Sequence, residues 1–185
     1  MEKPPLPEII REISQSEFAA FKTLWHYMDH RSYLSGVYLR DFFNTPYFLN
    51  MFAHVLPKDK GKFPHFKYYL RNIILLTPGE HVLLDQGTED QRISYSKTVK
   101  TADWGKIDIL RKDLLSEYNA VFPKMSGIMI MRYKEEEVRD VIRKLNGIFV
   151  GLLLQESIRK QTPSKPNNKK DNNRQDKKKN NDPPS

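Results

Sequence analysis

Residues that could contact a polyanion are concentrated in one segment, Lys58 to Arg71, which reads KDKGKFPHFKYYLR. Its basic side chains could neutralise phosphates, and the rings between them could stack on bases. The spacing of Phe66 and Tyr69 is equally typical of a buried helix face beside a solvated lysine loop. The candidate nucleic-acid-binding residues of this segment are Lys58, Lys60, Lys62, Lys67 and Arg71.

A second basic segment ends the sequence. Residues 161–185 contain no apolar side chain except proline, and the stretch from Arg159 onward holds nine Lys and Arg against three Asp. That net charge of +6 is most of the chain's +8. Such a composition cannot bury enough apolar surface to offset its ordering entropy, so we expect a disordered arm that holds cations near a polyanion. Its candidate binding residues are Lys169, Lys170, Arg174, Lys177, Lys178 and Lys179.

Patterns for other chemistry are incomplete. His26 and His30 are four residues apart, but Tyr27 stands where a metalloprotease helix needs Glu, and no third ligand is evident. The segment 59–62 lacks the full phosphate-loop pattern, and no serine lies in a Gly-x-Ser-x-Gly turn. The absence of cysteine excludes thiolate nucleophiles and thiolate metal sites. We therefore predict a non-enzymatic protein with no metal site and no cofactor.

The scaffold that must position these segments is predicted to be mainly α-helical. Residues 1–13 form a proline-rich lead-in, 14–160 one helical domain of about six helices with a small β-hairpin, and 161–185 the tail. The predicted helices run from Ser14 or Ser16 to His30, over 33–43, 46–56 and 64–76, from Thr101 or Asp103 to about Val121, and over 135–160. The predicted hairpin joins 81–85 to 92–95 around Gly87.

That hairpin offers a further possibility, a winged-helix domain. The segment 64–76 would then be the recognition helix, and Arg92 and Lys97 would lie near the nucleic-acid backbone. The alternative is an ordinary helical domain that the hairpin covers.

The helix at 135–160 has the clearest periodicity in the chain. Its apolar side chains recur at i, i+3 and i+4, and Gly147 and Gly151 are four residues apart. Such a helix packs in the domain's own core, contacts a partner or a second copy of the chain, or associates with a membrane surface.

Two functions follow as hypotheses. The preferred one is nucleic-acid association, to DNA or RNA, in which the arm supplies phosphate affinity and the segment 58–71 supplies structured contacts. The alternative is an interaction or assembly protein whose helical body binds a partner or itself, with the tail as a solvated linker. The N-terminus lacks a signal-peptide pattern, and no apolar run approaches the roughly 20 residues of a membrane span. We expect a soluble, cytoplasmic protein.

Overall fold

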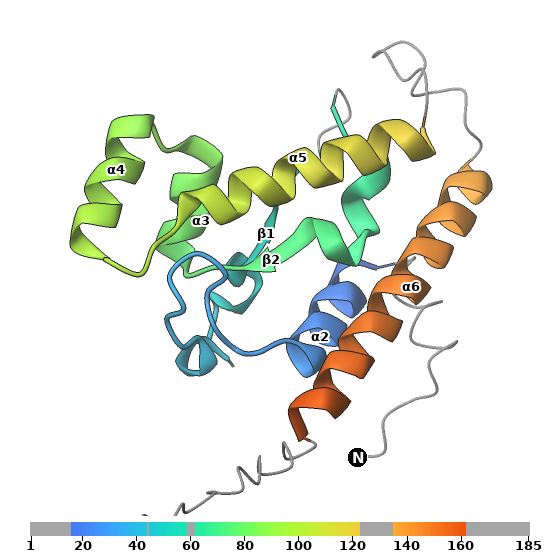
Figure 1. Ribbon diagram of the computed structural model, residues 1–185, viewed down its shortest axis with the longest axis horizontal. Coiled ribbons are helices and arrows are strands. Elements are labelled where there is room, and N and C mark those ends of the chain that lie inside the picture. The colour runs from blue at the N-terminus through green and yellow to red at the C-terminus, as the bar shows by residue number, and fades with distance from the viewer. Residues whose placement is uncertain (1–15, 44, 59–61, 123–134, 162–185) are drawn as a thin grey trace, which may run out of the picture.

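The fold is mainly α-helical, as predicted. The structure, a computed structural model, describes residues 16–43, 45–58, 62–122 and 135–161, with side chains up to residue 156. Helices and strands carry the labels of Figure 1. The α-helices within the described residues are α2 (Glu17–Tyr27), α3 (Pro78–Gln86), α4 (Glu89–Thr98), α5 (Trp104–Val121) and α6 (Glu135–Gln161). Short 3-10 helices lie at Arg40–Phe42, Phe48–Met51, Pro64–Tyr68 and Leu70–Asn72.

A two-stranded antiparallel sheet lies at the centre of the described body (Figure 1). Strand β1 (Phe52–His54) pairs with β2 (Ile73–Leu75), with Ala53 opposite Ile74. Because side chains alternate along a strand, Ala53 and Ile74 face one apolar cluster, whereas Phe52, Ile73 and Leu75 face another. The sheet therefore has both faces buried and separates two cores.

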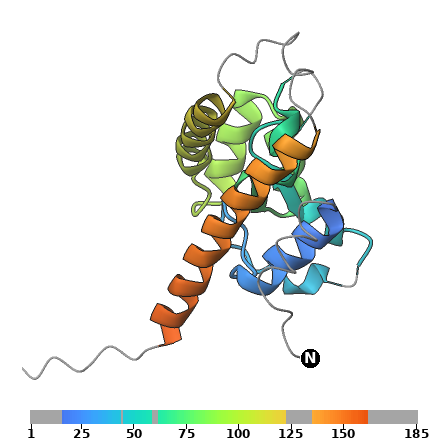
Figure 2. The ribbon, with the colours of Figure 1, turned by 90° about the vertical axis from the view of Figure 1, so that its right-hand side faces the viewer.

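The two cores are built from different helices. The first contains Ile107, Leu114 and Tyr118 of α5 with Phe66 and Ile142. The second contains residues of α2 with Met51, Leu70 and Val150. Figure 1 shows α3 and α4 at one end of α5, with α2 and α6 toward the other side of the sheet, and Figure 2 shows the last turns of α6 extending away from the other helices. None of the described helices is long and apolar enough to cross a membrane.

Three predicted helices are confirmed with their caps or flanking charges. Ser16 accepts a hydrogen bond from the Ala19 amide at the start of α2, and Asp103 accepts one from the Gly105 amide at the start of α5. Acidic residues occupy the first turn of α6, where the helix dipole favours them.

The helices predicted over 33–43, 46–56 and 64–76 are wrong. The first segment is a turn at Gly36, which has a φ of +75°, followed by a 3-10 helix. The other two are 3-10 helices that lead into β1 and β2. Strands buried on both faces present continuous apolar runs, and periodicity cannot distinguish such runs from a buried helix segment.

The hairpin predicted at 81–95 is also wrong, because α3 and α4 occupy these residues. Each begins with a capping box, in which a threonine side chain and a residue three positions later satisfy each other's amides. The pairs are Thr77 with Glu80, and Thr88 with Gln91. The sequence patterns TPGE and TEDQ carry this signal, so the winged-helix interpretation has neither its wing nor its recognition helix.

Buried polar side chains fix the irregular segments to the helices. The Asn146 side chain of α6 accepts a hydrogen bond from the Leu70 amide and donates one to the Tyr68 carbonyl, both at 2.9 Å. Asn72 is fully buried and bonds to both the amide and the carbonyl of Leu56. Because an unpaired buried amide would be costly, these contacts help to specify one arrangement of the chain.

Candidate functional site

The basic side chains at 58–71 bind carboxylates of the same chain. Lys58 and Lys67 both pair with Glu17 of α2, Lys67 at an Nζ–Oε2 distance of 3.4 Å. Arg71 pairs with Glu117 at 3.0 Å and with Asp113 at 3.4 Å, both on α5. These three cations are therefore partly neutralised within the fold.

Of the other predicted nucleic-acid-binding residues, the structure describes only Lys62. Lys62 is exposed, and Lys60 lies outside the described residues. The tail residues Lys169, Lys170, Arg174, Lys177, Lys178 and Lys179 also lie outside them.

Electrostatics around Glu17 reflect this internal pairing. Partial burial raises the pKa of the Glu17 carboxyl, but the hydrogen bond from Lys58 and the charges of Lys58 and Lys67 outweigh it and lower the pKa overall. Burial lowers the pKa of the neighbouring His54 imidazole. Both pKa shifts arise from burial and from neighbouring charges inside the fold, so Lys58 and Lys67 are engaged with Glu17.

The rings of the same segment are core residues. Phe66 is fully buried and Tyr69 is 3% exposed. Phe63 packs edge-on against Tyr118 with ring centroids 5.1 Å apart, and His65 lies 4.9 Å from the Phe122 ring. Buried rings have no free face for a base. These rings instead pack the segment against the C-terminal part of α5.

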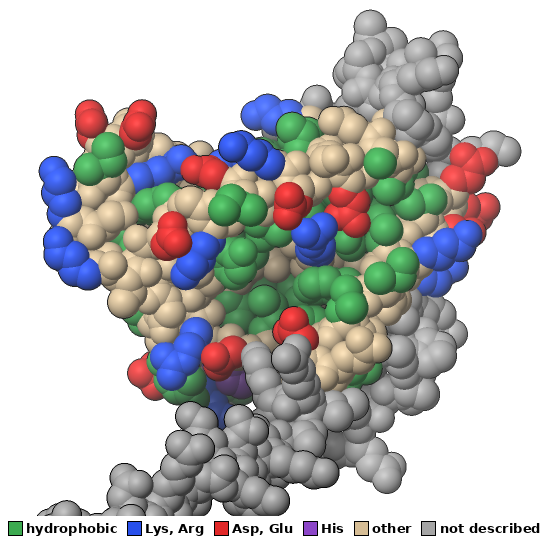
Figure 3. Space-filling model, in the orientation of Figure 1, with side chains coloured by type: hydrophobic (Ala, Val, Ile, Leu, Met, Phe, Trp, Pro, Cys, Tyr) green, Lys and Arg blue, Asp and Glu red, His purple; other side chains and the backbone are tan. Residues whose placement is uncertain are grey.

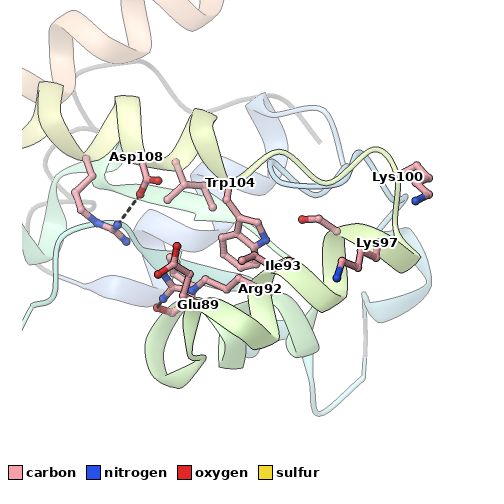
Figure 4. Close-up of a pocket in the computed structure, with 11 residues that line it drawn as sticks. Glu89, Arg92, Ile93, Lys97, Lys100, Trp104 and Asp108 are labelled. Carbon is pink, nitrogen blue, oxygen red and sulfur yellow. Dashed lines mark hydrogen bonds and ion pairs between the residues drawn. The ribbon is translucent and has the colours of Figure 1, made fainter.

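A different set of polar groups surrounds a pocket between α4 and α5. The pocket has a volume of about 540 Å³ and an apolar wall formed by Leu84, Ile93 and Ile107. Figure 4 shows Trp104 extending from α5 toward α4, where it lies beside Arg92 and Ile93. Both helices have a side-chain N-cap, Thr88 for α4 and Asp103 for α5, and these caps stabilise the first turn of each wall.

Charge is divided between the two ends of this pocket. Lys97 and Lys100 lie at one end, and Glu89 and Asp108 lie at the other (Figure 4). Asp108 is paired with Arg111 at 3.0 Å. No carboxylate of the described residues lies within ion-pair distance of Lys97, Lys100 or the nearby exposed Lys106, so these cations contrast with those at 58–71.

Arg92 and Trp104 form the middle of the pocket. The Arg92 guanidinium carbon lies 5.2 Å from the centre of the Trp104 ring, and its N–H groups donate to the Leu83 and Leu84 carbonyls at the end of α3. The Trp104 Nε1–H is buried and has no hydrogen-bond partner among the residues that the structure describes. The sequence reasoning noted Arg92 and Lys97 only as wing residues and missed Trp104, because recognising the pocket depends on recognising α4 as a helix.

A second surface feature is the groove between α5 and α6. Leu145, Ile148, Phe149, Leu152 and Leu153 line it, with Arg71, Glu117 and Glu156 among its polar residues. Ile148 is 65% exposed and Leu152 is 54% exposed. Figure 3 shows hydrophobic side chains gathered in the hollow between these helices, with charged side chains at its borders.

The histidine pair does not form a site. Helix α2 ends at Tyr27, so His30 leaves the helix face that carries His26. The His30 ring instead stacks on Trp25 at 4.1 Å, and its Nε2 lies 2.7 Å from the Trp25 carbonyl oxygen. Within the described ranges, no three His, Asp or Glu side chains are grouped so that they could hold a metal ion.

Comparison of the chain with protein-family models, with curated proteins and with solved structures finds no match.

Proposed function

We propose that the protein is a non-enzymatic nucleic-acid-associated protein in which the basic arm supplies most of the phosphate affinity. The division of charge carries this proposal, since the residues from Arg159 onward hold a net +6 and the preceding 158 residues hold +2. A polycation gains affinity by releasing counterions from nucleic acid, and this gain does not depend on a fixed geometry.

In this proposal the folded body contacts nucleic acid through Lys97, Lys100 and Lys106, here called the α4–α5 corner, and not through the segment 58–71. Lys97, Lys100 and Lys106 are exposed and lack an intramolecular carboxylate partner in the described part of the chain. By contrast, Lys58, Lys67 and Arg71 would have to give up contacts with Glu17 or Glu117 in order to bind phosphate. Unpaired cations lose less on binding, and this favours the corner.

Fluorescence anisotropy with short DNA and RNA, single- and double-stranded, tests the proposal over a salt series. If six arm cations contact phosphates, affinity for duplex DNA falls at least about a thousandfold between about 50 and 200 mM salt. Removal of residues 161–185 should abolish most of this slope. Binding that is insensitive to salt, or unchanged by the deletion, would contradict the proposal.

A matched pair of variants locates the contribution of the body. The triple variant Lys97→Gln, Lys100→Gln, Lys106→Gln should weaken binding and reduce the salt slope by about 0.7 to 0.9 for each lost contact. The control is Lys144→Gln, an exposed lysine on α6. Equal effects per lysine in the two proteins would remove the corner from the interface.

A second candidate function is assembly, and the exposed apolar residues of α6 favour it. We propose a second copy of the chain as the occupant of this surface. Ile148 is the midpoint of Glu135–Gln161, so antiparallel pairing about Ile148 would align the whole helix with its copy. Glu137 and Arg159 are equally distant from Ile148 along the sequence, as are Glu136 and Lys160. This arrangement would place the two acidic residues opposite the two basic ones in a self-complementary contact. Asp140, which would fall opposite Glu156, is already paired with Arg143.

Sedimentation velocity across a concentration series tests self-association. The expected result is a dimer that Ile148→Asp dissociates, because a carboxylate would be buried at the centre of the contact. Ile109→Asp on α5 is the control, since Ile109 is 64% exposed and Ile148 is 65% exposed. A chain that stays monomeric at all concentrations, or a dimer that Ile148→Asp leaves intact, would exclude this surface.

A further inference from the structure

We propose that the pocket between α4 and α5 binds one nucleotide unit, with its base beside Trp104 and its phosphate at Lys97 and Lys100. If the unit belongs to a DNA or RNA strand, the inference rests on the proposed nucleic-acid function. A free nucleotide offers the same base and phosphate to the pocket.

The size and lining of the pocket suit such a ligand. Its volume of about 540 Å³ lies within the roughly 300–1,000 Å³ common for small-molecule sites. The wall of Leu84, Ile93 and Ile107, together with the indole, offers the apolar surface that a flat base needs. A small inorganic anion would leave this wall uncovered.

The polarity along the pocket gives the ligand a direction. The ammonium groups of Lys97 and Lys100 at one end match a phosphate (Figure 4). Glu89 at the other end has no ion pair or hydrogen bond with a described residue, so its carboxylate can accept an N–H from an exocyclic amine. A base with an amino group therefore fits better than one with a carbonyl at the same position.

Trp104 and Arg92 would give the ligand two further contacts. The indole lines the pocket with its ring, whereas its Nε1–H is buried away from solvent and has no acceptor among the described residues. The neighbouring Arg92 also carries a charge that no carboxylate of the described residues balances by an ion pair. An acceptor oxygen of the ligand would balance the Arg92 charge, and the base would pack against the indole ring.

The walls are held in place before any ligand binds. Tyr95 of α4 donates a hydrogen bond at 2.9 Å to the fully buried Glu80 of α3. Burial and the Glu80 carboxylate raise the pKa of Tyr95 to about 12, so the hydroxyl remains a donor at neutral pH. Arg92 links α4 to the carbonyls at the end of α3. A preformed site avoids part of the entropic cost of binding.

Titration of the full chain with CMP, UMP and cytidine, followed by calorimetry and by the two indole N–H resonances, tests the inference. CMP should shift the Trp104 resonance, and it should bind more tightly than UMP, which lacks the amino group, and than cytidine, which lacks the phosphate. Trp104→Ala removes the ring on which the base packs, so it should weaken CMP binding at least about fivefold. Lys97→Gln with Lys100→Gln should weaken CMP about tenfold and leave cytidine unchanged.

The Glu89 variant and a control complete the test. Glu89→Ala should equalise CMP and UMP, whereas Lys144→Gln on α6 should change neither affinity. Absence of a Trp104 shift with every nucleotide, or equal binding by the pocket variants and the parent chain when melting temperatures are unchanged, would overturn the pocket.

Comparison with a short single strand separates the two sources of the ligand. If binding of the oligonucleotide depends on the arm but not on Trp104, Lys97 or Lys100, the pocket is not a nucleotide site, and the proposed nucleic-acid function still holds. Mononucleotide binding without any strand binding would support the pocket and overturn the nucleic-acid function.

Discussion

The segment 58–71 and the α4–α5 corner both combine cations with aromatic rings, yet the fold uses them in opposite ways. In the first, Lys67 and Arg71 are paired with carboxylates, and Phe66 is fully buried. In the second, Lys97 and Lys100 have no such partner in the described residues, and the Trp104 ring lines a pocket. Composition alone therefore does not show whether a cation is available to a ligand, because its partners come from distant parts of the chain.

The largest expected difference between the two regions is in folding stability. Phe66→Ala should cost about 3–5 kcal/mol, because it leaves a cavity beside Tyr118 and Phe122 in a fully buried site. Ile93→Ala at the pocket should cost less than about 1 kcal/mol, since Ile93 is 47% exposed. Urea denaturation followed by circular dichroism measures both, and similar values would remove the distinction.

A smaller effect concerns the support of the pocket. Glu80→Ala should cost about 2–3 kcal/mol, because Ser32, Tyr95 and the Thr77 amide would all lose their acceptor. Glu89→Ala is the matched control, an exposed glutamate in the first turn of α4, and it should cost about 0.3–1 kcal/mol. Thermal unfolding of both variants gives the comparison, and equal losses would mean that Glu80 does not hold α3 and α4 in place.

The pH dependence of the free energy of unfolding should depend on Glu17, which pairs with Lys58 and Lys67 of the segment 58–71. The pKa of Glu17 is lower in the folded chain than its ordinary 4.5, so its contribution is complete above about pH 4.5 and is lost as pH falls through the folded value. Glu17→Gln should therefore flatten the fall in stability below pH 4.5, by less than about 1 kcal/mol. Urea midpoints from pH 3 to pH 7 test this, and curves that remain parallel would show that Glu17 titrates normally.

The smallest expected effect distinguishes single lysines. Lys67→Gln should lower stability by up to about 1 kcal/mol through loss of the Glu17 pair, an amount reduced by its exposure to solvent. Lys97→Gln should stay within about 0.5 kcal/mol of the parent chain. A larger loss from Lys97→Gln would reveal a structural role for that ammonium group.

The sequence predicted the long amphipathic helices, because caps and periodicity agree there. Helices α2 and α5 begin after Ser16 and Asp103, and α6 begins with its acidic turn. It did not reveal β1 and β2, because strands of three residues with both faces buried show no alternation. The pocket could have been anticipated only from the capping box at Thr88, which makes 89–98 a helix and aligns Arg92 with Trp104.

The position of α6 in the chain also has a consequence for biosynthesis. Ile142 completes one core and Val150 completes the other, and each follows all the other buried residues of its own cluster. During translation, the apolar surfaces around Phe66 and Leu70 stay uncovered until this helix leaves the ribosome. The nascent chain is therefore most exposed to aggregation and to chaperones just before α6 emerges, and a stop codon ahead of residue 142 would yield a product that cannot close either core.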